Sequence, residues 1–314
     1  MANPLVTVVT PSFNQGKFIR ATIESVLNQS YREIEYIVCD GGSSDETLEI
    51  LKGYRDPRMR WVSEPDKGQT DAINKGIRAS SGLYITYLNS DDILLPSAIQ
   101  YTVDYFQAHP TVDILFGDCD FVDAEGRQIG TFVSAPFDVG RHIVGAQPIA
   151  QSGTFWRRQV KERIGDLDEH LHYTMDYEYW LRAGLSDCVL EYAPGSRSAT
   201  RLHGESKTSS QKYGFLQEWE RIFVQLFSKP DLPPSIVQLR EDAFEFIAWR
   251  RVKLDWLRRD FANCRPVLRR FTESKKWSRR LLATTMLVDS YFNTPFTNAV
   301  NHFFITFKHT DLFN

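Results

Sequence analysis

Apolar and polar positions follow two different periods along the first 120 residues. Short β-branched runs such as Leu5–Thr10 and Glu35–Cys39 are typical of strands buried in a sheet. Between these two runs, Phe18, Ile23 and Leu27 recur at a spacing typical of a helix. Because strand and helix alternate regularly, the pattern predicts an α/β fold, a parallel sheet with helices on both faces.

The same alternation continues to residue 120. Further strands are expected at 59–62, 83–88 and 113–116, and further helices at 43–51, 72–82 and 96–108. Ser43 and Glu46 have the spacing of a capping box, which predicts the start of the second helix. Pro96 suits the first turn of the last of these helices.

After residue 120 the pattern is less regular. The chain predicts a hairpin at 120–133, short helices near 157–164 and 177–184, a strand at 188–192 and a mobile polar loop at 195–212. From about residue 212 the pattern is helical, and Pro230, Pro233 and Pro234 divide it into separate helices. We therefore expect two domains, an α/β domain at 1–212 and a helical, basic and aromatic region at 213–314.

Composition is ordinary for a globular protein, with 42% apolar and 25% charged residues in a chain of 314. The four cysteines show neither metal-ligand nor paired spacing, which favours a reducing compartment. The first residues lack the pattern of a signal peptide, and no uncharged apolar run reaches 18 residues. We therefore expect a cytoplasmic protein, with peripheral contact at the inner face of the plasma membrane as a further hypothesis.

Charge is distributed unevenly along the chain. The segment 250–280 holds twelve Lys and Arg against three acids, a net charge of +9. Because the whole chain carries −3, the remainder carries −12. This asymmetry predicts an acidic body with a basic appendage.

The predicted strand at 83–88 leads directly into Asn89, Ser90, Asp91 and Asp92. Two adjacent carboxylates repel each other unless a cation lies between them or one of them is protonated. Hard divalent cations such as Mg²⁺ and Mn²⁺ use such oxygens and share them with substrate phosphates. Asp91 and Asp92 therefore indicate a metal–phosphate site, and a solvated turn before the next helix is the alternative.

Two other predicted strands also end in polar or small residues, at 10–14 and at 40–45. Ligands of open parallel sheets bind outside the carboxyl ends of the strands. Gly41 and Gly42 would let a ligand approach the backbone closely, although alone they would indicate only a turn. The convergence of three such ends on one edge is what favours a binding site.

Together these motifs resemble family 2 glycosyltransferases with the GT-A fold. The matching stretches are Val-Val-Thr-Pro-Ser-Phe-Asn at 8–14, Asp-Gly-Gly-Ser-Ser-Asp-Glu-Thr at 40–47, Gly68 with 71–76, 82–92, and Met-Asp-Tyr-Glu-Tyr-Trp-Leu-Arg at 175–182. Their order and spacing over about 180 residues fit the family, and the chain after roughly 215 lies outside the resemblance.

The resemblance implies transfer of a sugar, with inversion, from a nucleotide-diphosphate donor to an acceptor hydroxyl. It implies a UDP-sugar donor and a glycan or lipid-linked acceptor, with a role in cell-surface polysaccharide or glycolipid synthesis. Mn²⁺ or Mg²⁺ would neutralise the leaving diphosphate. Asp91 matches the metal-binding aspartate, whereas Asn89 replaces the first acid of the usual Asp-x-Asp motif and leaves the strictness of metal dependence open.

The resemblance also assigns the nucleotide pocket. Asp40 matches the residue that accepts a hydrogen bond from the base, and Gly41 replaces the usual second aspartate. The expected nucleotide-binding residues are Pro11, Ser12, Phe13, Asp40, Lys67, Gly68, Asp71, Asn89 and Ser90.

Asp176 matches the catalytic base of the family. An inverting transfer needs a carboxylate that takes the acceptor proton during attack. Met175 replaces the glutamate that usually precedes it. Taken without the resemblance, Asp176 would be interpreted as a helix N-cap, and the two roles are compatible.

The segment 201–207 follows the base-bearing helix and supplies further candidates. His203 resembles a metal or diphosphate contact, and Arg201 and Lys207 are candidates for binding phosphate. Gln151 and Trp180 are candidates for acceptor contacts, although a tryptophan is more often part of a core.

The basic tail leaves several interpretations open. Trp249, Trp256 and Trp277 among its cations suit a membrane interface, and a helical packing domain with a solvated basic face is the alternative. The acidic body and the lack of a recognised module disfavour nucleic acid as a partner. Rival functions are a non-catalytic sugar-nucleotide-binding or scaffold protein of a polysaccharide assembly complex, and a nucleotidyltransferase. The nucleotidyltransferase is disfavoured because this sequence has no Gly-rich triphosphate loop after the first strand.

Overall fold

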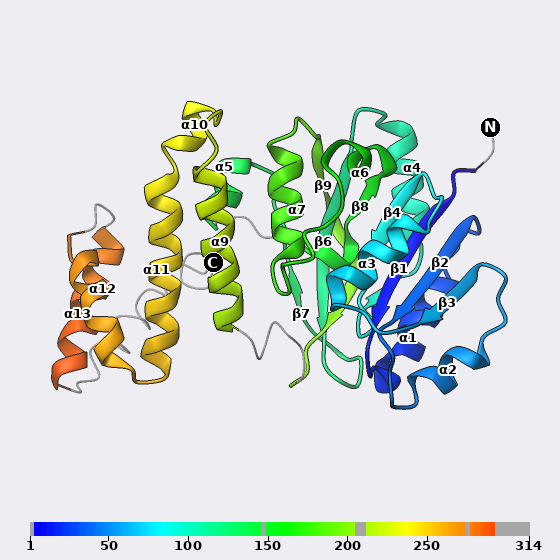
Figure 1. Ribbon diagram of the computed structural model, residues 1–314, viewed down its shortest axis with the longest axis horizontal. Helices are drawn as coiled ribbons and strands as arrows, with labels where there is room; N and C mark the ends of the chain where they lie inside the picture. The colour runs from blue at the N-terminus through cyan, green and yellow to red at the C-terminus, as the bar shows by residue number, and fades with distance from the viewer. Residues whose placement is uncertain (1–2, 146–148, 205–211, 274–276, 293–314) are drawn as a thin grey trace. The chain divides into compact units, whose positions relative to one another are not determined.

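The computed structural model describes residues 3–145, 149–204, 212–273 and 277–292. Two compact units are present (Figure 1). The described part of the first unit consists of residues 3–142 and 149–204, and that of the second of 143–145, 212–273 and 277–292.

Within the described residues, nine strands form one sheet in the first unit. Their bounds are β1 Val6–Ser12, β2 Ile34–Asp40, β3 Met59–Ser63, β4 Tyr84–Tyr87, β5 Ile93–Leu94, β6 Ile114–Val122, β7 Gln128–Phe132, β8 Phe155–Arg157 and β9 Leu190–Arg201. The order is β3-β2-β1-β4-β8-β6-β9-β5, and β7 pairs with β6. Strands β3, β2, β1 and β4 are parallel, and β8 runs antiparallel to β4 and β6. The sheet is therefore mixed.

Helices cover both faces of the sheet, as the alternating pattern predicts. Their bounds are α1 Gly16–Leu27, α2 Thr47–Gly53, α3 Gln69–Arg78, α4 Ala98–Ala108, α5 Val139–Ile143, α6 Arg158–Ile164 and α7 Met175–Gly184, with a 3₁₀ turn η1 at Gln151–Gly153. Val6 and Val8 of β1 lie in one buried cluster with residues of α1 and α4. Val9 points to the opposite face, where a Cβ added to Gly76 of α3 would lie 2.4 Å from its Cγ1. Successive side chains of β1 thus contact helices on opposite faces.

Two local predictions are wrong. The segment 195–201 is not a loop, because β9 continues to Arg201 by pairing with β6 and, antiparallel, with β5. The capping box is also absent from the start of α2, since Ser43 donates to Asp40 instead. Asp45 accepts from the backbone N–H of Thr47 at 3.0 Å in its place. In the first case the partners come from other segments, and in the second Ser43 bonds both Asp40 of its own turn and the distant backbone N–H of Asn14.

The second unit is helical, as the proline-separated pattern predicts. Its elements after residue 211 are α9 Lys212–Phe227, α10 Pro234–Val237, α11 Arg240–Leu257, α12 Phe261–Phe271 and α13 Trp277–Phe292. Trp249 is 8% exposed and belongs to the core of this unit, and Trp256 packs against the same core. These two rings therefore stabilise helix packing. No helix among the described residues is long and apolar enough to cross a bilayer.

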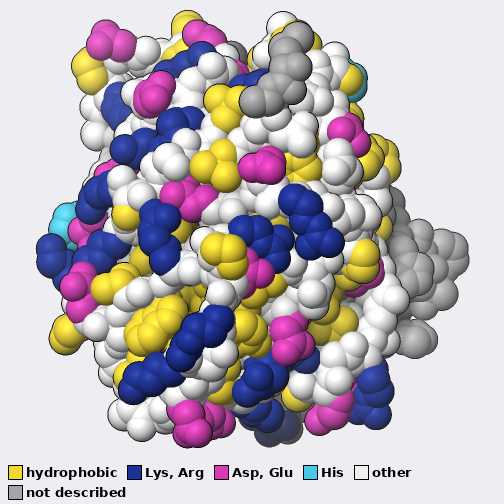
Figure 2. Space-filling view, turned by 90° about the vertical axis from the view of Figure 1, so that its right-hand side faces the viewer, with side chains coloured by type: hydrophobic (Ala, Val, Ile, Leu, Met, Phe, Trp, Pro, Cys, Tyr) yellow, Lys and Arg dark blue, Asp and Glu magenta, His cyan; other side chains and the backbone are white. Residues whose placement is uncertain are grey.

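Figure 2 shows the face of the molecule that lies at the right in Figure 1. Lysine and arginine side chains of the described residues are interspersed there with acids and with apolar side chains. This mixture of signs is typical of a solvated surface.

Glu35 of β2 links three segments of the first unit. Its carboxylate accepts hydrogen bonds from Thr7 Oγ1 at 2.7 Å, from the backbone N–H of Ser81 at 2.8 Å and from Arg60 Nη1 at 2.8 Å. Burial acts to raise the pKa of this carboxyl, but the three hydrogen bonds together lower the pKa from 4.5 to about 2.

Replacing Glu35 should therefore reduce stability in a pH-dependent way. The lowered pKa means that the carboxylate stabilises the fold above pH 4.5, and that this stabilisation is lost as pH falls towards about 2. Because solvent screens the partly exposed Arg60 pair, we expect Glu35→Gln to lower the free energy of unfolding by about 1–3 kcal/mol at neutral pH. The measurement is urea unfolding at several pH values.

Glu49→Gln is the matched control, since Glu49 is exposed on α2 and makes no side-chain hydrogen bond within the described residues. Its stability should follow that of the parent at every pH. If the deficit of Glu35→Gln stayed constant between pH 7 and pH 3, this account of the carboxylate would be contradicted.

Candidate active site

Three strand ends lie at one edge of the sheet, as the sequence predicts. Ser12 at the end of β1 is the register partner of Asp40 at the end of β2. Val9 of β1 pairs with Tyr87, the last residue of β4, and the chain continues from there into 88–92. Parallel pairing therefore brings the first residues of the predicted nucleotide and metal sites to the same edge.

Asp40 is 2% exposed and holds the turn after β2. Its Oδ2 accepts from the backbone N–H groups of Gly42 at 3.1 Å and Ser43 at 2.9 Å, and from Ser63 Oγ at 2.6 Å. Its Oδ1 accepts from Ser43 Oγ. Since a carboxylate oxygen can accept about two hydrogen bonds, Oδ1 retains capacity for one more donor.

The end of β1 combines an exposed ring with a buried hydroxyl. Phe13 is 60% exposed, whereas Pro11 and Ser12 are buried. Ser12 Oγ is buried and has no hydrogen-bond partner within the described residues. Asn14, with φ of 52°, ties this end to the next one, because its N–H donates to Ser43 Oγ at 2.7 Å. The arrangement offers a flat apolar surface beside polar groups.

Asn89 is a centre of side-chain hydrogen bonds after β4. Its Oδ1 accepts from Gln69 Nε2 at 2.7 Å, and its Nδ2 donates to Asp92 Oδ2 at 3.2 Å. Gln151 lies beside it, with its Oε1 3.5 Å from Asn89 Nδ2 and its own Nε2 donating to the carbonyl of Tyr87 at 2.7 Å. Residues from α3, from the β4 end and from η1 therefore meet at Asn89.

Asp91 lies beside His203. His203 Nε2 is 3.0 Å from Asp91 Oδ2, and the two side chains are 7% and 22% exposed respectively. The imidazole also packs on Phe18, with ring centroids 4.7 Å apart. A carboxylate and an imidazole are thus held together although 112 residues separate them in the chain.

Asp92 is 3% exposed and has a structural role. Its Oδ1 accepts from the backbone N–H of Arg201 at 3.0 Å. Burial, and then the neighbouring charge of Asp91, raise the pKa of Asp92 well above its usual range. Ser90 is also buried, and the Thr22 hydroxyl donates to the carbonyls of both Ser90 and Asp92.

The guanidinium of Arg201 is buried and used for internal hydrogen bonds. It donates to the carbonyls of Asp91, Asp123 and Ala124, each at 3.0 Å. The side chain is 6% exposed. In this structure Arg201 therefore positions the backbone of Asp91, and its donors face carbonyls rather than an open phosphate site.

Asp176 lies in the first turn of α7, and its Oδ1 accepts from the backbone N–H of Tyr177 at 2.8 Å. The N-cap is Thr174. Burial, and then the charges of Asp176 and Asp92, raise the pKa of Tyr87 well above its usual value. Trp156 lies between the two segments, because its ring packs edge-on against Tyr87 of β4 at 6.3 Å and against Trp180 of α7 at 5.6 Å between centroids, so α7 lies near the β4 end.

Gln69, which donates to Asn89, has three candidate residues beside it in the chain, namely Lys67, Gly68 and Asp71. Gly68 has φ of 120° and begins α3, and a Cβ there would lie 3.5 Å from His172 Nδ1. Asp71 Oδ2 accepts from the backbone N–H of Lys67 at 3.0 Å. That hydrogen bond and the nearby Lys75 lower the pKa of Asp71. The Lys67 side chain is exposed.

Trp180 lies elsewhere, and one further candidate cannot be placed. Trp180 is 1% exposed and packs edge-on against Trp156, so its indole belongs to the core of the first unit. Lys207 lies outside the described residues.

The sequence prediction did not include Gln69 or Tyr87 among the site residues. Gln69 directly follows Gly68 in the matching stretch of the family resemblance, so its place in the sequence indicates a site residue. Tyr87 ends an apolar strand, and nothing in the local pattern separates it from a core residue.

The donor set at Asp91 fits a divalent cation that shares its ligands with a substrate. The described residues contain no group of three or more His, Cys, Asp or Glu side chains able to hold a metal ion. Asp91 and His203 supply two neighbouring donors. Mg²⁺ and Mn²⁺ commonly combine one or two protein ligands with substrate phosphate and water, so a two-residue site is sufficient.

Solved structures define the class of fold. The chain superposes on TarS 1–349 of S. aureus in complex with UDP-GlcNAc with a TM-score of 0.62 and 16% identity, covering 97% of this chain and 92% of that one. For the mannosyltransferase PcManGT of Pyrobaculum calidifontis in complex with GDP-Man and Mn²⁺, the TM-score is 0.63 at 16% identity, covering 96% of this chain and 85% of that one. The first unit thus has the predicted GT-A fold of glycosyltransferases, and helices follow it.

Sequence comparison gives the family. The model of glycosyl transferase family 2 matches residues 7–201, so the chain belongs to this family. It is 31% identical to the chondroitin synthase of Escherichia coli over 181 residues, which are 57% of this chain and 26% of that protein. It is 34% identical to an uncharacterized glycosyltransferase of Mycobacterium tuberculosis over 185 residues, 58% of this chain and 70% of that one. The match thus spans about a quarter of the E. coli relative.

Arg201→Met should destabilise the protein strongly. The change removes donors from three part-buried carbonyls, and a buried acceptor that is left unpaired costs about 1–3 kcal/mol. We expect the free energy of unfolding to fall by about 2–4 kcal/mol in chemical denaturation, since relaxation recovers part of the loss. Arg127→Met is the matched control, because the Arg127 side chain is 75% exposed in its ion pairs with Asp123 and Glu125. Equal stability losses in the two variants would show that Arg201 does not hold these carbonyls.

Proposed function

We propose that this glycosyltransferase moves a sugar from a UDP-sugar to an acceptor hydroxyl with inversion, in the synthesis of a cell-surface polysaccharide or glycolipid. The observation that carries the proposal is the meeting of Asp40, Asp91 and Asp176 around one sheet edge. Strand pairing brings in Asp40, the β4 end carries Asp91, and Trp156, which packs on both Tyr87 and Trp180, links that end to the helix of Asp176.

The nucleotide would bind over the ends of β1 and β2. Phe13 offers an exposed ring on which a base can stack, and Asp40 Oδ1 can accept one more hydrogen bond from a base N–H. Ser12 Oγ, buried without a partner in the described residues, would donate to the nucleotide as well. A uracil N–H and the ribose hydroxyls supply complementary groups. A relative in fold binds UDP-GlcNAc, which supports a UDP donor.

Asp91 and His203 would hold Mn²⁺ or Mg²⁺ against the diphosphate. A bound divalent cation neutralises the charge that develops on a leaving nucleoside diphosphate. Asn89 brings no charge to this place, but its amide orients Asp92 and Gln69. That PcManGT was solved with Mn²⁺ supports divalent metal use in this fold.

Asp176 would accept the acceptor proton as the hydroxyl attacks the anomeric carbon. Asp176 Oδ1 accepts from the Tyr177 backbone N–H in the first turn of α7, which would orient the carboxylate for this role. Gln151, beside Asn89, would contact the sugar or the acceptor. An attack from the side opposite the leaving diphosphate gives inversion.

A lipid-linked or glycan acceptor would accord with the basic second unit, whose cations suit the anionic lipids of the cytoplasmic leaflet. Because Trp249 and Trp256 pack internally, this peripheral contact would rest on lysine and arginine rather than on an aromatic belt. A non-catalytic sugar-nucleotide-binding or scaffold role is the alternative, and the joint presence of the three carboxylates favours catalysis.

Donor and metal use can be read from thermal stabilisation. We expect a UDP-sugar with Mn²⁺ to raise the melting temperature more than GDP-mannose with Mn²⁺ or either donor with EDTA, since a ligand stabilises the state it binds. Asp91→Asn should abolish the increment due to Mn²⁺ and leave most of that due to nucleotide. If no nucleotide sugar raised the melting temperature, donor binding at this edge would be disproved.

Asp176→Asn tests the base directly. Removing a general base lowers turnover by about 10²–10⁴-fold. We expect UDP release in the presence of acceptor to fall by that factor, while donor affinity stays within about twofold of the parent. Glu178→Gln is the matched control, since Glu178 lies on the same helix in an ion pair with Arg182. Normal turnover by Asp176→Asn would remove Asp176 from the reaction, and absence of turnover by the parent with every donor would favour the binding protein.

A further inference from the structure

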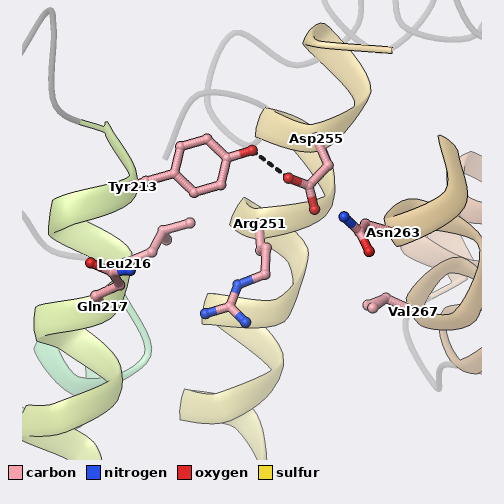
Figure 3. A pocket seen from close by; sticks show the side chains of 7 residues that line it. All are labelled: Tyr213, Leu216, Gln217, Arg251, Asp255, Asn263 and Val267. Atoms are coloured by element: carbon pink, nitrogen blue, oxygen red, sulfur yellow. Dashed lines mark hydrogen bonds between the residues drawn. The ribbon is translucent and has the colours of Figure 1, made fainter. Parts of the chain in front are cut away.

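A cavity lies wholly within the helical unit. Its volume is about 460 Å³, which falls in the range of small-molecule sites of about 300–1,000 Å³. Seven residues line it, namely Tyr213, Leu216, Gln217, Arg251, Asp255, Asn263 and Val267 (Figure 3). None of them belongs to the nucleotide and metal sites described above.

Three helices contribute matched pairs of side chains to this cavity. Tyr213 and Gln217 lie four residues apart on α9, Arg251 and Asp255 on α11, and Asn263 and Val267 on α12. Residues four apart lie on the same face of a helix. The lining is therefore one face from each of three neighbouring helices, and five of its seven side chains are polar.

Asp255 is the central polar group. It is 8% exposed, and its Oδ1 accepts the hydroxyl proton of Tyr213. Its second oxygen makes no hydrogen bond within the described residues, and Figure 3 shows the carboxylate between the Tyr213 hydroxyl and the Asn263 amide. This second oxygen is accessible from the cavity, so a donor supplied by a ligand could bond it there.

Other lining groups also have unused hydrogen-bonding capacity. Arg251 Nη2 donates to Glu220 at 2.9 Å, and Asn263 Nδ2 donates to Asp260 at 2.8 Å, which leaves the Asn263 carbonyl oxygen available. Gln217 is exposed and makes no side-chain hydrogen bond within the described residues. Leu216 and Val267 add an apolar surface.

The charges in and around the cavity select a neutral ligand. Arg251 and Asp255 cancel within the lining, and Arg251 is already paired with Glu220. The Arg258 guanidinium lies 4.2 Å from the centre of the Tyr213 ring, so a cation would meet two arginines near Asp255. An anion would meet the Asp255 carboxylate. Hydroxyl groups both donate and accept, and they match a lining of carboxylate, guanidinium and amides.

We propose that this cavity binds a neutral saccharide unit of the acceptor glycan. The polar side chains would bond its hydroxyls, and Leu216 and Val267 would contact the C–H face of the sugar ring. The proposal rests on the proposed function in taking the acceptor to be a glycan. It adds a saccharide subsite made only of residues from the helical unit.

The test is binding of the labelled full chain, without donor or metal, to an array of immobilised oligosaccharides. The neutral probes are malto-, manno-, lacto- and chito-oligosaccharides, and the acidic probes are chondroitin and hyaluronan oligosaccharides. We expect saturable binding to at least one neutral series. Asp255→Asn should weaken that binding about tenfold or more, and Gln217→Ala several-fold, since each removes a bond to a hydroxyl.

Gln225→Ala is the matched control for Gln217→Ala, because Gln225 is an exposed glutamine of the same helix outside the cavity. It should bind like the parent. Because Gln217 is exposed and unbonded, its variant remains informative even if Asp255→Asn fails to fold. Binding to acidic probes only, no binding, or equal binding by the Gln217 and Gln225 variants would overturn the proposal.

Failure of this proposal is distinguishable from failure of the proposed function. Array binding needs no turnover, so a chain that binds neutral glycans through this cavity but transfers no sugar would refute the enzyme alone. A chain that transfers sugar but binds no neutral glycan on the array would refute the cavity alone.

Discussion

The two carboxylates after β4 are held to the end of β9 by a reciprocal pair of hydrogen bonds. Asp92 accepts the backbone N–H of Arg201, and the Arg201 guanidinium donates back to the carbonyl of Asp91. This pair joins segments about 110 residues apart in the chain. His203 follows Arg201 by two residues, and its imidazole contacts Asp91. The pairing of β5 with β9 supports the same connection.

The hydrogen bonds at this edge explain why an asparagine stands at position 89. Its amide accepts from Gln69 and donates to Asp92 at the same time. An ionised aspartate in its place could accept but not donate, and it would add a third negative charge beside Asp91 and Asp92. Asn89 thus replaces the usual acid at a place where the buried carboxyl of Asp92 needs a hydrogen-bond donor. Metal binding would then rest on Asp91 with His203.

The helical unit shows how composition and packing differ in what they reveal. Twelve cations in 250–280 suggested an external surface, yet Trp256 of this stretch and Trp249 directly before it contribute to a core. The faces of α9, α11 and α12 that meet around Asp255 are polar, although helices usually bury apolar faces against each other. Leu216 and Val267 add apolar surface to this lining, while the second Asp255 oxygen, the Gln217 amide and the Asn263 carbonyl oxygen stay open to hydrogen bonding. These open groups beside an apolar surface are the physical argument for a ligand there.

Local patterns determined much of this protein. The period-2 and period-3.6 runs predicted the order of strands and helices, and the strand ends correctly indicated Asp40 and Asp91 as residues of one edge. The extension of β9, the start of α2 and the internal use of Arg201 were decided only by tertiary structure. The reason is that periodicity and strand ends depend on neighbours in the chain, which the sequence contains. The partners of 195–201, Ser43 and Arg201 come from distant segments, and only the folded chain brings these together.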